Sequence, residues 1–137
     1  MNRRSVLARA MALVGAAATA ISLSAAPATA EGAPEFFLVD VLILKEGKTP
    51  ADAKVYFDKV GPVAAKHGLV QLNSLQIAQK LRGNLDAKVV NIWSVSDPKK
   101  TLPGLLSDPD YQQHIPVRDS TFDLPNSSIF MAMPNAE

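Results

Sequence analysis

The chain has 137 residues and no cysteine, which limits both its size class and its chemistry. A chain of this length is expected to form one small domain. Without cysteine it has no disulfide, thiolate zinc site, iron–sulfur cluster or cysteine nucleophile. The 14 Lys and Arg residues nearly balance the 13 Asp and Glu residues, so the formal net charge is +1.

The first 30 residues have the pattern of an export signal. Arg3, Arg4 and Arg9 precede a charge-free, alanine-rich run at 10–26, and Ala-Thr-Ala at 28–30 offers the small-x-small pattern that signal peptidase reads. The run is too short and too weakly apolar for a stable membrane span, so we expect cleavage and a periplasmic or secreted protein. The paired arginines resemble a twin-arginine signal. A Sec signal has a similar outline, so both export routes stay open.

Removal of the predicted signal leaves a single domain, residues 31–137, with a different charge. It keeps 11 Lys and Arg and all 13 Asp and Glu residues, a net charge of −2. No run of like charges and no basic helix face remains. We therefore expect no nucleic-acid partner, and no membrane partner after signal removal.

The first half of this domain reads as a strand followed by a helix. Residues 36–44 are mostly aromatic, β-branched or leucine, which favours a strand. Thr49 suits a helix N-cap and Pro50 the first helical position. The apolar stripe that follows predicts a helix that Pro62 kinks and Gly68 ends.

The second half reads as a hairpin, a helical region and a last strand. The strands are expected at 69–79, 88–95 and 126–133, with a turn at 81–86 between the first two. A weaker helical region opens at Asp97 and is broken by Pro103 and Gly104. It restarts at 107–110 and runs to about Arg118.

The order βαββαβ predicts an α+β, ferredoxin-like fold, in which a four-stranded antiparallel sheet carries two helices on one face. In the strands at 36–44, 88–95 and 126–133, both alternating sets of side chains are largely apolar. A solvated face would alternate with polar residues, so the second face is expected to be covered. The simplest cover is the same sheet of a second copy, which predicts a homodimer.

One segment resembles a known family. Residues 108–119, Asp-Pro-Asp-Tyr-Gln-Gln-His-Ile-Pro-Val-Arg-Asp, are similar to a Ser/Asp-Pro-Glu/Asp-Tyr-Gln…Pro-x-Arg-Asp segment of an uncharacterised family in the dimeric α+β barrel superfamily. The resemblance extends over 36–133, with departures at 67–68 and 82–85. Relatives in this superfamily include EthD-like proteins, cofactor-free monooxygenases of antibiotic biosynthesis, muconolactone isomerases and haem-degrading enzymes. The resemblance implies a dimeric α+β barrel and no single activity.

Two polar residues interrupt apolar strands that are expected to be neighbours. Asp40 and Asn91 must therefore be paired with each other, with a helix or with water. A buried Asp40 would have a raised pKa, which suits a general base. The alternatives are a backbone donor or a wet dimer seam. Trp93 is a candidate for stacking on an aromatic ligand, or a core or interface residue.

The second helical region carries the remaining candidates. If the helix is continuous, one of its faces carries Tyr111, His114, Ile115 and Arg118. Pro116 indicates that the helix can break at this point. On that face Arg118 offers a bidentate donor and His114 a titratable group, above a floor of Asp40 or Asn91 and Trp93. The alternative is that Tyr111 and Ile115 pack while His114 and Arg118 are solvated.

The two histidines predict no metal site. His67 precedes Gly68 at a helix end, where it suits a cap or, as the alternative, a ligand contact. No metal-binding pair and no phosphate loop is present, so neither a metal nor a cofactor is expected. Haem with one axial histidine stays open without local support.

Three functions remain open. The first is an exported small-molecule-binding or accessory protein with an apolar cleft between sheet and helices. The second is a cofactor-independent monooxygenase or isomerase that acts on a small aromatic or carbonyl compound, with Asp40 or His114 as base. The third is a structural or stress-related homodimer without a ligand. The small number of polar groups favours the first, and whether the protein is an enzyme stays open.

Overall fold

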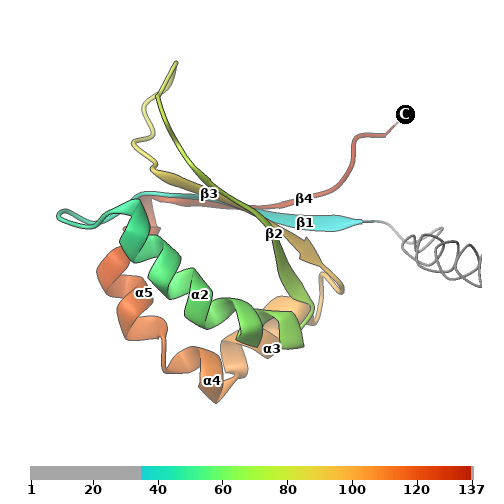
Figure 1. The fold of residues 1–137 in the computed structure, drawn as a ribbon. Coiled ribbons are helices and arrows are strands. Elements are labelled where there is room, and N and C mark those ends of the chain that lie inside the picture. The colour runs from blue at the N-terminus through green and yellow to red at the C-terminus, as the bar shows by residue number, and fades with distance from the viewer. Residues whose placement is uncertain (1–34, 137) are drawn as a thin grey trace, which may run out of the picture. The chain divides into compact units, whose positions relative to one another are not determined.

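One antiparallel sheet and a layer of helices on one of its faces make up the fold (Figure 1). This computed structural model describes residues 35–136, so the predicted signal and its cleavage site lie outside the described residues. The strands are β1 (Phe36–Leu42), β2 (Leu69–Gln76), β3 (Val89–Val95) and β4 (Ser128–Ala132), in the order β2-β3-β1-β4. All three strand pairs are antiparallel. The predicted α+β, ferredoxin-like sheet is confirmed.

The first helix, α2 (Pro50–Lys66), begins where the sequence predicts. Thr49 and Asp52 form a capping box, in which the Thr49 backbone N–H donates to Asp52 Oδ2 at 2.8 Å and Thr49 Oγ1 accepts from the Asp52 N–H. The helix runs through Pro62 without interruption and ends at Lys66. Gly68 follows the C-cap residue, and its φ of +84° is the left-handed conformation that favours glycine.

The second crossover consists of three short helices, not one interrupted helix. They are α3 (Thr101–Ser107), α4 (Pro109–Gln112) and α5 (Ile115–Thr121), followed by a 3-10 turn at Leu124–Asn126.

The breaks differ from the sequence prediction for two reasons. The expected break at Pro103 and Gly104 is wrong, because Pro103 lies in the first turn of α3, where its missing N–H would have no partner in any case. The helical region breaks instead at Asp108, which ends α3 and caps α4, and again after Gln112. Pro116 has no N–H to donate to the Gln112 carbonyl four residues back, so α4 does not continue into α5.

The core lies between the helices and the side of the sheet that faces them. Leu38, Asp40 and Leu42 of β1 and every second residue of β3 are buried there, and the apolar ones pack against the apolar stripe of α2. Aromatic rings join the layers: Phe57 of α2 lies 5.8 Å from Trp93 of β3, and Tyr56 lies 5.4 Å from Phe122, measured between ring centroids.

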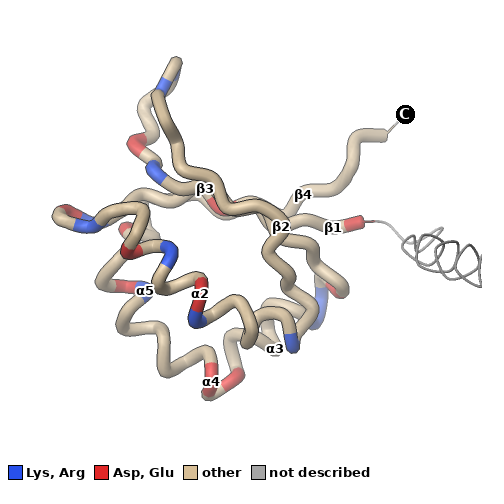
Figure 2. The backbone as a smooth tube through the Cα atoms, in the orientation of Figure 1, with Lys and Arg blue, Asp and Glu red and all other residues tan. Residues whose placement is uncertain are grey.

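The other face of the sheet is apolar and has no cover within the described chain (Figure 1). Val39 lies between Ile92 of β3 and Phe130 of β4 on this face, and Phe130 is 55% exposed. Charged residues are concentrated on the helices and loops, whereas most of the sheet carries none (Figure 2). We call the uncovered face of the sheet, which includes Val39, Ile92 and Phe130, the open sheet face. Its composition matches the second apolar face expected from the sequence.

Candidate functional site

A cavity of about 250 Å³ lies between the covered face of the sheet and the helix layer. Its walls are mostly aliphatic and aromatic side chains, with only a few polar groups among them. The polar side chains that line it are those of Asp40, Tyr56, Tyr111 and Arg118, with the Trp93 indole beside them. A cavity of this kind suits a small organic molecule.

Asp40 lies at the centre of the sheet and forms the polar floor of the cavity. It is 6% exposed, and its β3 partner across the sheet is Asn91. Asp40 Oδ1 accepts from Asn91 Nδ2 at 2.7 Å and from the Asn91 backbone N–H at 3.2 Å, and Oδ2 accepts from Trp93 Nε1 at 2.9 Å. Burial raises the pKa of Asp40, and these three hydrogen bonds only partly oppose that shift.

A second layer of amides holds Asp40 in place. Asn91 is fully buried and does not line the cavity; its Oδ1 accepts from Gln71 Nε2 of β2 at 3.0 Å. The chain Gln71–Asn91–Asp40 therefore crosses three neighbouring strands and fixes the orientation of the carboxylate. Asp40 pairs with no Lys, Arg or His in residues 35–136.

Two tyrosines and an arginine form a second polar part of the cavity lining, which we call its polar end. The hydroxyls of Tyr56 and Tyr111 lie 3.4 Å apart, and Arg118 Nη1 donates to the Tyr111 hydroxyl at 3.0 Å. Burial raises the pKa of Tyr56, and the Tyr111 hydrogen bond and the Asp40 charge add to the shift. Partial burial alone would lower the pKa of Arg118, but hydrogen bonds to Tyr111 and Asp119 outweigh it and raise that pKa.

The structure brings together most of the residues that the sequence singles out. Asp40 and Asn91 are hydrogen-bonded neighbours as expected, and Trp93, Tyr111 and Arg118 line the cavity with Asp40. Two further residues of this site are not identified from the sequence. Tyr56 belongs to an apolar helical stripe, so only its hydroxyl could indicate a role in the site. Gln71 looks like an ordinary polar residue of an edge strand.

The expected placement of His114 beside Tyr111 and Arg118 in the cavity is wrong. The helix is interrupted between α4 and α5 at this residue, so Tyr111 and Arg118 meet in the cavity without His114, which is half-buried and is not among the residues that line the cavity. Trp93 lines the cavity, but its ring packs against Phe57 and its Nε1 is held by Asp40, so it is a wall rather than a free stacking platform.

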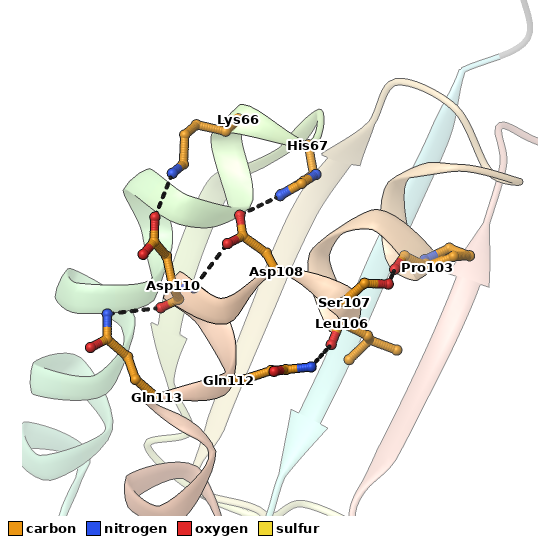
Figure 3. Close-up of polar contacts among 9 residues, drawn as sticks. All are labelled: Lys66, His67, Pro103, Leu106, Ser107, Asp108, Asp110, Gln112 and Gln113. Atoms are coloured by element: carbon orange, nitrogen blue, oxygen red, sulfur yellow. Dashed lines mark hydrogen bonds and ion pairs between the residues drawn. The ribbon is translucent and has the colours of Figure 1, made fainter.

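His67 also lies away from the cavity, at a junction between helices (Figure 3). As the C-cap residue of α2 it directs Nε2 to Asp108 Oδ2 at 2.7 Å, while Asp108 Oδ1 accepts from the Asp110 N–H at the start of α4. Lys66 and Asp110 pair beside it at 3.2 Å. The capping interpretation of His67 therefore fits its surroundings, and its hydrogen bond lowers the pKa of Asp108.

A second hollow, of about 450 Å³, lies between the start of α2 and strands β2 and β3. Its charged residues, Lys54 and Asp58, pair with each other at 2.7 Å and are largely exposed. Residues 35–136 contain no cluster of three His, Asp or Glu side chains that could hold a metal ion. Over the same residues, no helix has the length and apolar character to cross a membrane.

Comparison with solved structures places this fold. A NIPSNAP family protein of unknown function from Agrobacterium tumefaciens matches with a TM-score of 0.58 at 19% identity, over 76% of this chain and 91% of the other. An uncharacterised NIPSNAP domain protein from Burkholderia xenovorans matches with a TM-score of 0.57 at 18% identity, over 74% and 95%. A Dabb family protein with a ferredoxin-like fold from Mesorhizobium loti matches with a TM-score of 0.54 at 11% identity, over 76% and 100%.

The chain therefore shares the ferredoxin-like α+β fold of these proteins. The resemblance noted in the sequence is thereby confirmed at the level of structure. At these sequence identities, similarity to the solved structures indicates a shared fold and does not indicate an activity. No protein-family model matches the sequence, and no curated protein matches it either.

Proposed function

We propose that this protein binds a small, largely apolar organic molecule in the cavity between the sheet and the helices. The observation that supports this most is the cavity itself, a space of about 250 Å³ with apolar walls and polar groups only at its floor and at one end. Apolar walls supply affinity through burial, and a few placed polar groups orient the ligand.

Filling the cavity tests the proposal. Leu105 lines the cavity and is 4% exposed, so Leu105→Phe should occupy part of the space. Val55 is 52% exposed on α2, and Val55→Phe is the matched control. We expect isopropylbenzene to shift the NMR signal of the single indole N–H, Trp93, in the wild type and the control and not in Leu105→Phe. Equal binding by all three proteins, or by none, would contradict the proposal.

A cofactor-independent enzyme, a monooxygenase or isomerase acting on a small aromatic or carbonyl compound, is the second candidate. A carboxylate that faces an apolar cavity and has a raised pKa is suited to remove a proton from a bound substrate. Of the two bases considered from the sequence, His114 lies outside the cavity, so Asp40 is the candidate. Asp40→Asn should then abolish turnover while retaining binding. A binding protein would keep its function in this variant.

We also propose that the protein is a homodimer through the open sheet face, and that it is exported to the periplasm or beyond. Half-exposed Val39 and Ile92 and exposed Phe130 give this face an apolar centre that a second copy would cover. Export rests on the sequence of the first 30 residues alone. A structural homodimer without a ligand is the outcome if the cavity binds nothing.

A further inference from the structure

The polar end of the cavity has more hydrogen-bond donors than acceptors. Tyr56 and Tyr111 each contribute one hydroxyl proton, and only one proton can lie between two oxygens 3.4 Å apart. Arg118 Nη1 occupies an acceptor site of the Tyr111 oxygen and adds no acceptor of its own. Whichever tyrosine donates to the other, one phenolic proton has no acceptor among residues 35–136.

Arg118 increases this excess of donors. Its Nε donates to Asp119 and its Nη1 to Tyr111, and its other N–H groups have no partner within the described residues. The Arg118 side chain is 23% exposed, so these N–H groups can reach water. The two tyrosines are buried, and a buried donor without an acceptor is costly and is normally satisfied in folded proteins. The tyrosine pair therefore lacks one acceptor that a bound molecule can supply.

The charges in the cavity define the kind of acceptor. Asp40 brings a carboxylate without a cationic partner in residues 35–136, while Asp119 already pairs with Arg118 at 2.9 Å. An anionic ligand would place a second negative charge in the same apolar space as Asp40, which is unfavourable. A neutral carbonyl oxygen supplies the acceptor without that charge.

We propose that the ligand is a neutral carbonyl compound whose oxygen accepts a hydrogen bond from the Tyr56–Tyr111 pair, with its body against the apolar walls. The proposal rests on the proposed function, since it names the ligand class of the same cavity. Arg118 is a positioning residue, because its bond to Tyr111 polarises the hydroxyl pair and keeps it at the cavity.

Three probes of equal size separate the possibilities. Acetophenone carries a carbonyl group, and in isopropylbenzene a second methyl group stands in place of the carbonyl oxygen. Benzoate carries a negative charge. All three have the same number of non-hydrogen atoms. Binding is followed through the indole N–H signal of Trp93, the single tryptophan. We expect acetophenone to bind about tenfold more tightly than isopropylbenzene, which corresponds to one neutral hydrogen bond, and benzoate to bind more weakly than acetophenone.

Variants of the two tyrosines test which groups cause the preference for acetophenone over isopropylbenzene. Tyr56→Phe and Tyr111→Phe each leave one hydroxyl with an unused proton, so each should still prefer acetophenone. The double variant has neither hydroxyl and should bind both neutral probes within about twofold of each other, with its affinity for isopropylbenzene unchanged. That unchanged affinity shows that the cavity is intact.

Each contrary result has a distinct meaning. Equal binding of acetophenone and isopropylbenzene by the wild type overturns the carbonyl proposal and leaves the binding function standing. Benzoate binding most tightly overturns the neutral ligand class. A double variant that keeps the full preference overturns the tyrosine pair as donor. No binding of any probe overturns the proposed function and this inference with it.

Discussion

Asp40 and Trp93 are joined across neighbouring strands by a hydrogen bond of 2.9 Å from the indole Nε1 to Oδ2. With the two bonds from Asn91, it gives the carboxylate three donors and no positive charge. The carboxylate is thus held in one orientation at the floor of the cavity while burial disfavours its ionised form. A charge kept in such a place costs stability, and this cost favours a functional role for Asp40.

The first prediction concerns the titration of Asp40. Because burial raises its pKa in the folded protein above the ordinary value of 3.8, the folded protein holds this proton more tightly than the unfolded chain does. The free energy of unfolding should therefore fall as pH rises from 3.8 through the raised pKa. Asp40→Asn lacks this titration, so the stability of the wild type relative to the variant should decline over that window. Urea unfolding of both proteins at a series of pH values measures it, and a difference independent of pH would contradict it.

The second prediction concerns the junction of α2 and α4. Asp108→Ala removes both the contact with His67 and the cap on α4, whereas Asp108→Asn can keep the cap. We expect the melting temperature to fall more in Asp108→Ala than in Asp108→Asn. Because the pKa of Asp108 is lowered in the folded state, the stability it contributes should be lost as pH falls below the ordinary value of 3.8.

Asp110→Asn is the control for this junction, since its ion pair with Lys66 is exposed and should contribute little. If Asp110→Asn destabilises the protein as much as Asp108→Ala does, the junction does not depend on Asp108.

The third prediction compares two glycines in helices. At Gly61 of α2 an added Cβ meets nothing within 4 Å, so Gly61→Ala should stabilise the protein by about 0.5–1 kcal/mol. At Gly104 of α3 the added Cβ would lie 3.0 Å from His67 Nδ1. Since Asp108 holds that ring, Gly104→Ala should destabilise the protein. Thermal unfolding of both variants decides, and a stabilised Gly104→Ala would show that the ring moves freely.

The fourth prediction concerns the open sheet face. Ile92→Asp places a charge at its centre and forfeits roughly 1.5–3 kcal/mol of apolar burial in each copy of a dimer. We expect this variant to dissociate or unfold, whereas Val55→Asp on the exposed side of α2 should not. Light scattering at low micromolar concentration measures the mass. A wild-type monomer at that concentration would rule out the dimer.

The fifth prediction concerns export. The mature protein should begin at Glu31, directly after Ala-Thr-Ala at 28–30. Mass measurement of exported protein locates its first residue, and an intact N-terminus would contradict cleavage. Replacing Arg3 and Arg4 with Lys should block export by the twin-arginine route only.

The strands, the start of α2 and the placement of Asp40 and Asn91 on neighbouring strands could be predicted from the sequence, whereas the pairing of these two side chains was one of three possibilities. Short runs of aromatic, β-branched and leucine residues indicate strands, and the capping sequence from Thr49 marks a helix start regardless of what packs against it. A βαββαβ order then leaves few ways to arrange the sheet, which makes the two polar residues neighbours.

The cavity end could not be predicted, because it depends on how helices far apart in sequence pack together. Tyr56 and Tyr111 are 55 residues apart, and neither residue's surroundings indicate that the hydroxyls meet. The error at His114 has a local cause: Pro116 removes one backbone N–H, and the resulting break between α4 and α5 ends the continuous helical spacing on which the placement of His114 depended.

Native mass spectrometry of exported protein tests the central claim, that the cavity holds a small molecule, most directly. We predict that the wild type and Val55→Phe carry an added small mass that is absent from Leu105→Phe, because only the last variant fills the cavity. The same bare mass per chain for the wild type and both variants would contradict the claim.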